Sequence, residues 1–173
     1  MRYSIYVFII LAVLTLGMKF ADADSRDIER LIVSKDYIQA INLCTERLKQ
    51  GRNQETEETL FFLAEALVYS GSTEHARTVF QTLLSKYPAT PYLERLLLRT
   101  ADSWYMEYDY VRARDAYLDF LQKFPRSGYL PYVYLKLVYA SEKLGEWENK
   151  RTYLSMLESK YPSTIEASMI PEI

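Results

Sequence analysis

The sequence predicts an all-α protein, an α-solenoid of about four antiparallel helix pairs that repeat every 37 residues. Three observations carry this prediction. Lys-aromatic-Pro tripeptides stand at residues 86–88, 123–125 and 160–162, at intervals of 37. Between them, apolar residues recur at the three- and four-residue spacing that is typical of helices. The 173 residues include only five glycines and six prolines, too few for a turn-rich β-sandwich of this length.

The first 23 residues have the features of a secretory signal peptide. Arg2 precedes an uncharged apolar run over residues 5–18, and Ala-Asp-Ala at 21–23 offers the small-x-small pattern that signal peptidase cleaves. The run is shorter than the roughly 20 apolar residues of a membrane span. We therefore expect cleavage after residue 23 and export to the periplasm. The alternative is an uncleaved segment that anchors the chain to the inner membrane through residues 5–18, because Lys19 lies so near the cleavage site.

Four helix pairs and a short final helix are predicted to follow in order. The first pair, over residues 24–52, departs from the 37-residue spacing by one residue and is interpreted as a degenerate repeat or N-terminal cap. Three regular repeats are predicted over residues 53–89, 90–126 and 127–163. A short capping helix and tail are expected over residues 164–173. Terminal units of a solenoid need such modified faces because only one of their sides has a neighbour.

Each regular repeat is predicted to begin at a capping side chain and to end at a proline. Asn53, Thr90, Ser127 and Thr164 lie 37 residues apart. Side chains of these types accept hydrogen bonds from the N–H groups of a helix's first turn. The first helices are therefore expected to begin directly after these residues. Proline disfavours helix in the residue before it, which explains the end of each second helix.

A tight turn is predicted in the middle of each repeat. Gly71 and Gly145 are two periods apart and permit the left-handed backbone that ends a helix. Tyr108 and Asp109 stand at the corresponding place in the repeat between them.

The only cysteine, Cys44, lies in an apolar helical register, which predicts a buried free thiol. A single cysteine cannot form a disulfide within the chain. No cysteine lies near residue 23, so we expect no lipid on the mature N-terminus.

The repeats resemble the tetratricopeptide repeat, which has bulky, small, aromatic and proline residues at fixed positions. The matching residues of repeat 53–89 are Leu60, Ala64, Ala76, Phe80, Leu83 and Pro88. Those of repeat 90–126 are Leu97, Ala101, Ala113, Tyr117, Phe120 and Pro125. Those of repeat 127–163 are Tyr134, Val138, Lys150, Leu154, Leu157 and Pro162, with Lys150 in place of the family's alanine. The resemblance implies a right-handed solenoid whose first helices line a partner-binding groove.

The period exceeds the usual 34 residues of this family, and the extra residues follow the proline. In this the chain resembles a bacterial envelope subgroup that includes the outer-membrane-assembly lipoprotein BamD and the Tol-associated periplasmic protein CpoB. BamD-type proteins carry a lipidated cysteine and CpoB-type proteins an N-terminal coiled coil, and neither feature is matched here. The resemblance implies a protein-interaction scaffold in outer-membrane or envelope assembly.

No pattern for catalysis, cofactor or metal binding is present, so we expect no enzyme and no cofactor. His75 is the only histidine and is expected at a solvated edge. The acidic residues Asp102, Glu107 and Asp109 straddle a predicted helix end, and we expect them to be solvated, without a basic or metal-binding partner nearby. A formal net charge of −2 gives no general attraction to nucleic acid or to anionic lipid. Membrane contact is expected only through the partner or an uncleaved N-terminus.

The 16 tyrosines suggest a surface for protein or peptide partners, because tyrosine and arginine supply much of the binding energy in interfaces. The family resemblance places a stripe of aromatic, apolar and charged residues in the groove. Its predicted members are Phe61, Glu65, Tyr69, Arg95, Leu98, Asp102, Tyr105, Met106, Tyr132 and Tyr139. Binding through the convex face or the termini is the alternative, and some of these side chains are alternatively core.

Three functions are therefore kept open. The first is a non-enzymatic periplasmic scaffold that binds a partner peptide or subunit of an envelope complex in the groove. The second is a membrane-tethered structural subunit that retains its signal segment. The third is an accessory subunit of a secretory or wall-active enzyme whose catalytic groups lie in another chain.

Overall fold

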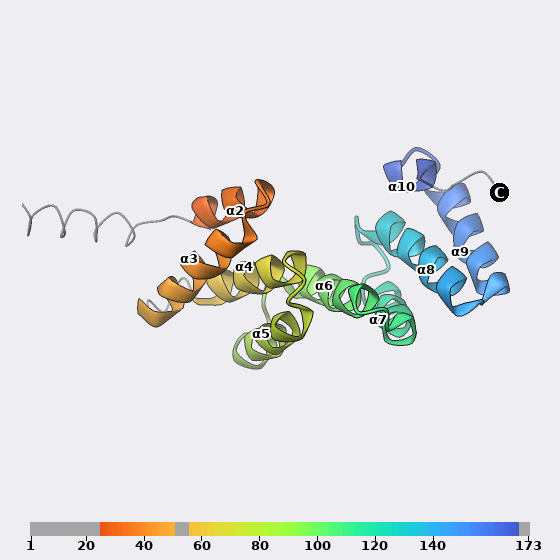
Figure 1. The fold of residues 1–173 in the computed structure, drawn as a ribbon. Helices are drawn as coiled ribbons and strands as arrows, with labels where there is room; N and C mark the ends of the chain where they lie inside the picture. The colour runs from red at the N-terminus through yellow and green to blue at the C-terminus, as the bar shows by residue number, and fades with distance from the viewer. Residues whose placement is uncertain (1–24, 51–55, 170–173) are drawn as a thin grey trace, which may run out of the picture.

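The computed structural model describes residues 25–50 and 56–169, and within these ranges the chain is a row of helices without strands. The predicted signal segment, residues 1–23, lies outside the described residues. Consecutive helices pack in antiparallel pairs, and the pairs follow one another from α2 at one end to α10 at the other (Figure 1). The helices are α2 (Ser25–Val33), α3 (Tyr37–Gln50), α4 (Thr56–Tyr69), α5 (Thr73–Lys86), α6 (Leu93–Met106), α7 (Tyr110–Lys123), α8 (Leu130–Leu144), α9 (Trp147–Lys160) and α10 (Ile165–Ser168). The predicted all-α solenoid of helix pairs is confirmed.

One turn geometry recurs between the two helices of every pair. In the second pair, the Ser72 N–H donates to the Leu67 carbonyl at 2.8 Å and the Gly71 N–H donates to the Val68 carbonyl at 3.0 Å. This hydrogen-bond pattern is the Schellman motif, which requires one residue with positive φ. The residues that adopt it are Lys35, Gly71, Tyr108 and Gly145, with φ of 63°, 84°, 63° and 71°. Two of the four pairs therefore make this turn without glycine.

The second helices α5, α7 and α9 each end at the lysine of a Lys-aromatic-Pro tripeptide. The first helices begin later than predicted: α6 starts at Leu93, three residues after Thr90. The Thr90 hydroxyl instead accepts a hydrogen bond from the Tyr92 N–H at 3.3 Å, and so closes the turn that precedes the helix. Ser127 does the same before α8, whereas Thr164 caps α10 directly. Asn53 lies outside the described residues.

Among the described residues, two apolar clusters form the core, and α6 contributes to both. Leu96 packs into a cluster with buried residues of α2, α3, α4 and α5. Leu98 packs into a second cluster with residues of α7 and α8. Ala76 and Ala113, which occupy the same repeat position, are both fully buried. Small side chains at this position let the two helices of a pair approach closely.

Lys150 stands where the other two repeats have a buried alanine, yet α8 and α9 pack closely. Its ammonium group reaches the edge of the helix pair, where Nζ lies 2.8 Å from Glu142 Oε2. The same group lies 5.6 Å from the centre of the Trp147 ring. The aliphatic stem therefore fills the space between the helices while the charge stays at the surface.

Helix α10 closes the C-terminal end by packing on α8 and α9 (Figure 1). The Tyr139 hydroxyl of α8 donates to the Met169 carbonyl at 3.5 Å. Tyr139 and Met169 are 30 residues apart. Hydrogen bonds between the first helices of neighbouring repeats, described below, join residues with the same separation. None of the helices in the described ranges is long and apolar enough to cross a membrane.

Candidate partner-binding surface

Two of the residues predicted for the groove belong to the core instead. Phe61 and Leu98 are buried, one in each apolar cluster. The Phe61 ring stacks on the Tyr92 ring with 4.2 Å between centroids. These two side chains therefore offer no surface to a partner.

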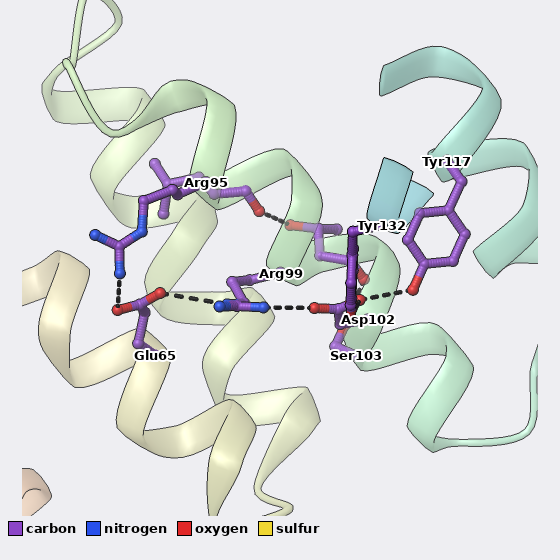
Figure 2. A network of polar contacts seen from close by, with 9 residues as sticks. Glu65, Arg95, Arg99, Asp102, Ser103, Tyr117 and Tyr132 are labelled. Atoms are coloured by element: carbon purple, nitrogen blue, oxygen red, sulfur yellow. Dashed lines mark hydrogen bonds and ion pairs between the residues drawn. The ribbon is translucent and has the colours of Figure 1, made fainter. Parts of the chain in front are cut away.

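Asp102 is 7% exposed and has three side-chain donors, so the expectation that it is solvated and lacks a basic partner is wrong. Its Oδ1 accepts hydrogen bonds from the hydroxyls of Tyr117, at 2.6 Å, and Tyr132, at 2.9 Å. Its Oδ2 accepts one from Arg99 at 2.8 Å. Figure 2 shows the carboxylate enclosed between these groups, which come from α6, α7 and α8. Burial, followed by the charge of Asp102, raises the pKa of both tyrosines.

Glu65 is the second buried carboxylate and is only 2% exposed. Arg95 donates to its Oε2 at 2.7 Å and Arg99 donates to its Oε1 at 3.3 Å. Arg99 therefore bridges Glu65 on α4 to Asp102 on α6 (Figure 2). Burial is the largest single effect and acts against the charged guanidinium, but Asp102, Tyr69 and Glu65 together outweigh it and raise the pKa of Arg99. Buried charges persist when they are paired and hydrogen-bonded in this way.

The two buried carboxylates occupy the same repeat position, since Asp102 follows Glu65 by 37 residues. Each accepts a hydrogen bond from the residue 30 positions later, which is Arg95 for Glu65 and Tyr132 for Asp102. The polar contacts therefore repeat with the fold. Aligning the sequence with itself at an offset of 37 residues would have shown that Glu65 and Asp102 share a repeat position. Each helix considered alone does not show this.

The other two acidic residues that were expected to be solvated also have partners. Glu107 forms an ion pair with Arg77 at 2.8 Å and accepts a hydrogen bond from Thr73, and so links α6 to α5. Asp109 caps α7 by accepting a hydrogen bond from the Arg112 N–H at 3.0 Å. These contacts stabilise the helix pairs and occupy carboxylate oxygens that acid–base chemistry would require.

The remaining predicted groove residues form an accessible surface over this network. Tyr69 is 39% exposed and lies under the guanidinium of Arg99, which is 5.0 Å from its ring centre. The Lys136 ammonium lies 4.4 Å from the ring centre of Tyr105 and 5.5 Å from that of Tyr132. We call Tyr69, Arg95, Arg99, Tyr105, Tyr132 and Lys136 the tyrosine–cation patch. Arg99 and Lys136 were missed by the sequence analysis.

Two predicted members lie at the margin of this patch. Met106, at the end of α6, is 44% exposed. Tyr139 is half-buried and holds α10 through its hydroxyl. The structure thus brings the exposed groove residues of α4, α6 and α8 into one surface that is backed by buried carboxylates.

The residues outside this surface show little reactive chemistry. Cys44 is buried, as predicted, and its burial raises the pKa of the thiol to about 12. His75 is exposed, as predicted. Across residues 25–50 and 56–169, no three His, Cys, Asp or Glu side chains are placed to hold a metal ion.

Comparison with known proteins places this architecture in a family. The model of the YfiO family, described as an outer membrane lipoprotein family, matches residues 53–161. The solved structure of PilF from Pseudomonas aeruginosa superposes with a TM-score of 0.58 at 20% sequence identity. The match covers 84% of this chain and 64% of PilF, so this chain spans a little under two thirds of that protein. No curated protein sequence matches the chain closely. The family match extends over more than half of the chain, which therefore belongs to the YfiO outer membrane lipoprotein family and is a tetratricopeptide-type protein of the bacterial envelope.

Proposed function

We propose that this protein is a non-enzymatic scaffold that binds a segment of a protein partner on its tyrosine–cation patch, within outer-membrane or envelope assembly. The observation that carries the proposal is that two buried carboxylates hold the patch side chains by hydrogen bonds. Glu65 and Asp102 are buried and fix the side chains of Arg95, Arg99 and Tyr132 from below. Side chains that are held in place before binding lose less conformational entropy on association.

The composition of the patch supports a protein partner. Tyrosine and arginine are enriched among the residues that dominate interface energies, because each combines a large contact area with polar groups. The exposed side chains of Tyr69 and Met106 add apolar surface at the margin. An extended or helical segment that lies across α4, α6 and α8 would contact all of these groups at once.

The proposal includes the organisation of the chain. Residues 1–23 would direct the protein to the periplasm, residues 24–52 would cap the solenoid, and repeats 53–89, 90–126 and 127–163 would form the binding surface. The segment over 164–173 would close the C-terminal end.

Site-specific photocrosslinking in the native envelope tests the site of binding. A photoreactive amino acid in place of Met106 is expected to give a protein adduct, whereas one in place of Leu118, on the outer face of α7, is expected to give none. Both positions are exposed apolar side chains near the middle of the chain. The double variant Tyr105→Ala and Tyr139→Ala is expected to weaken the Met106 adduct while the protein stays folded, although loss of the Tyr139 hydrogen bond should loosen α10.

The opposite results identify the alternatives. Adducts at Leu118 but not at Met106 would place the interface on the convex face. An adduct at Trp147 alone would place it at the C-terminal end, where that side chain is 60% exposed beside a hollow of about 330 Å³. Loss of folding in the double variant would show that the two tyrosines are core residues.

A further inference from the structure

Lys136 stands out because it repeats the position of Arg99 without repeating its partners. The two residues are 37 apart, on α6 and α8. Arg99 is bound by two carboxylates, Glu65 from the preceding repeat and Asp102 three residues later. The residue three positions after Lys136 is Tyr139, so the second carboxylate is missing.

The carboxylate that the preceding repeat offers to Lys136 already has other partners. Asp102 lies in the repeat before Lys136, but its oxygens already accept hydrogen bonds from Arg99, Tyr117 and Tyr132. Glu142, further along α8, is exposed and paired with Lys150. Among the residues that the structure describes, Lys136 therefore has no ion pair.

The surroundings of Lys136 make an unpaired cation costly. Its side chain is half-buried, and its ammonium faces the rings of Tyr105 and Tyr132. Burial lowers the pKa of Lys136 although the nearby charge of Asp102 acts against the shift, so the contacts of the ammonium do not fully replace the water that it loses. A carboxylate that arrived from outside would be attracted strongly here, because the site already excludes much of the solvent.

The charges of the wider patch point the same way. Three cations, Arg95, Arg99 and Lys136, are set against two carboxylates, Glu65 and Asp102. Both carboxylates are buried beneath the cations, so the surface that a partner meets carries the positive charge. Arg95 remains partly exposed even though it is paired with Glu65.

We propose that an aspartate or glutamate side chain of the bound partner pairs with Lys136 and takes the place that the Asp102 carboxylate has beside Arg99. This inference rests on the proposed function and gives the partner its chemistry, an acidic protein segment. Tyr139 occupies the repeat position of Asp102 and carries no negative charge that would repel such a carboxylate. The partner's carboxylate would then extend the series of charged groups that starts with Glu65, Arg99 and Asp102.

Peptide display tests the inference with a matched pair of variants. The probe is a phage-displayed library of random peptides fused through their C-termini, so no free terminal carboxylate is present. Peptides retained by the wild-type protein are expected to be enriched several-fold in Asp and Glu over the library. Lys136→Met is expected to abolish the enrichment, and Lys86→Met, which removes an exposed lysine from α5, is expected to leave it intact.

A retained acidic peptide then gives the affinity. With its C-terminus amidated, it is expected to bind Lys136→Met about tenfold more weakly than wild type, the effect of losing one charge-assisted hydrogen bond. Replacing the peptide's acidic residue by its amide is expected to cause the same loss, with no further loss in Lys136→Met. Because the lysine is unpaired and half-buried, Lys136→Met should keep the wild-type melting temperature, so weaker binding would not reflect unfolding.

Three results would overturn the inference, and they differ from one another. Retained peptides without acidic enrichment would leave the proposed function standing but remove the acidic partner. Retention of no peptides at all would count against both proposals. Equal binding of the acidic peptide to wild type and to Lys136→Met would show that its carboxylate pairs with another cation, and the assignment to Lys136 would be wrong.

Discussion

The Asp102 carboxylate illustrates how one side chain holds three helices of a solenoid together. It accepts hydrogen bonds from Arg99 on its own helix, Tyr117 on α7 and Tyr132 on α8. Tyr117 stands where the preceding repeat has Phe80, and both rings are buried. The extra hydroxyl of Tyr117 is tolerated in the core because Asp102 accepts its hydrogen bond.

Removal of that hydroxyl is therefore expected to destabilise the protein. Tyr117→Phe should lower the free energy of unfolding by about 1–2 kcal/mol, because Asp102 stays buried with one donor fewer. Urea denaturation measures the change. Tyr134→Phe is the control, since the Tyr134 ring is half-buried against Tyr161 and its hydroxyl has no hydrogen bond within the described residues. Equal losses in the two variants would show that the Asp102 contact contributes nothing to stability.

Cys44 gives a prediction about reactivity and pH. Burial raises the pKa of its thiol from 9.0 to about 12, so the folded protein holds the proton at pH values where the unfolded chain has released it. Stability should therefore fall as the pH rises from about 9 to 12, and Cys44→Ala should show a shallower fall. At pH 8 a thiol reagent should label Cys44 only after urea unfolds the chain. Rapid labelling of the native protein would contradict its burial.

At the scale of the elements, the turns between paired helices predict one substitution that lowers stability and one that raises it. Gly71 has a φ of 84°, and a Cβ added there would meet no atom within 4 Å. Gly71→Ala should therefore cost about 1 kcal/mol from backbone strain alone. Tyr108 makes the same turn with a φ of 63° and a largely exposed side chain, so Tyr108→Gly should raise stability by about 0.5–1 kcal/mol.

Thermal denaturation of the two single variants checks this prediction. Their melting temperatures should move in opposite directions from wild type. If Tyr108→Gly lowered the melting temperature, the contact of the Tyr108 ring with Tyr110, at 6.3 Å between centroids, would outweigh the strain.

The helices and their order could be predicted from sequence because the signals are local. The proline of each Lys-aromatic-Pro tripeptide ends α5, α7 and α9 by backbone geometry alone. The start of α6 was misplaced because Thr90 carries a hydroxyl that can cap either a helix or a turn, and the surrounding backbone decides which. The left-handed turn at Tyr108 followed from its alignment with Gly71 and Gly145, and not from its own residue type.

The surface was harder to predict because it depends on contacts between repeats. Phe61 and Glu65 lie one helical turn apart on α4, so periodicity places both on one face and cannot tell core from groove. For Asp102, the basic partner Arg99 was overlooked although it lies three residues earlier on the same helix. Its other partners, Tyr117 and Tyr132, are 15 and 30 residues away, so the sequence carries no local sign of them. Only the spatial stacking of successive helix pairs brings these side chains together.

On the scale of the whole molecule, α6 is the junction between two apolar cores. Leu96 faces the cluster of the N-terminal helices and Leu98 faces the cluster of the C-terminal helices. The chain of charges from Glu65 through Arg99 to Asp102 crosses the same junction from α4 to α8 (Figure 2). In a solenoid each unit contacts only its neighbours, so the stability of the two halves is coupled mainly through this helix.

A matched pair of cavities should reveal how strong that coupling is. Leu96→Ala and Leu98→Ala each remove the same buried atoms, two residues apart, and each should cost about 2–5 kcal/mol. If the halves are weakly coupled, hydrogen exchange should accelerate mainly in α4 and α5 for Leu96→Ala and mainly in α7 and α8 for Leu98→Ala. Uniform acceleration in both variants would instead mean that the polar links across α6 make the solenoid a single cooperative unit. In that case Asp102→Asn, which weakens the links without opening a cavity, should restore the difference between the two halves.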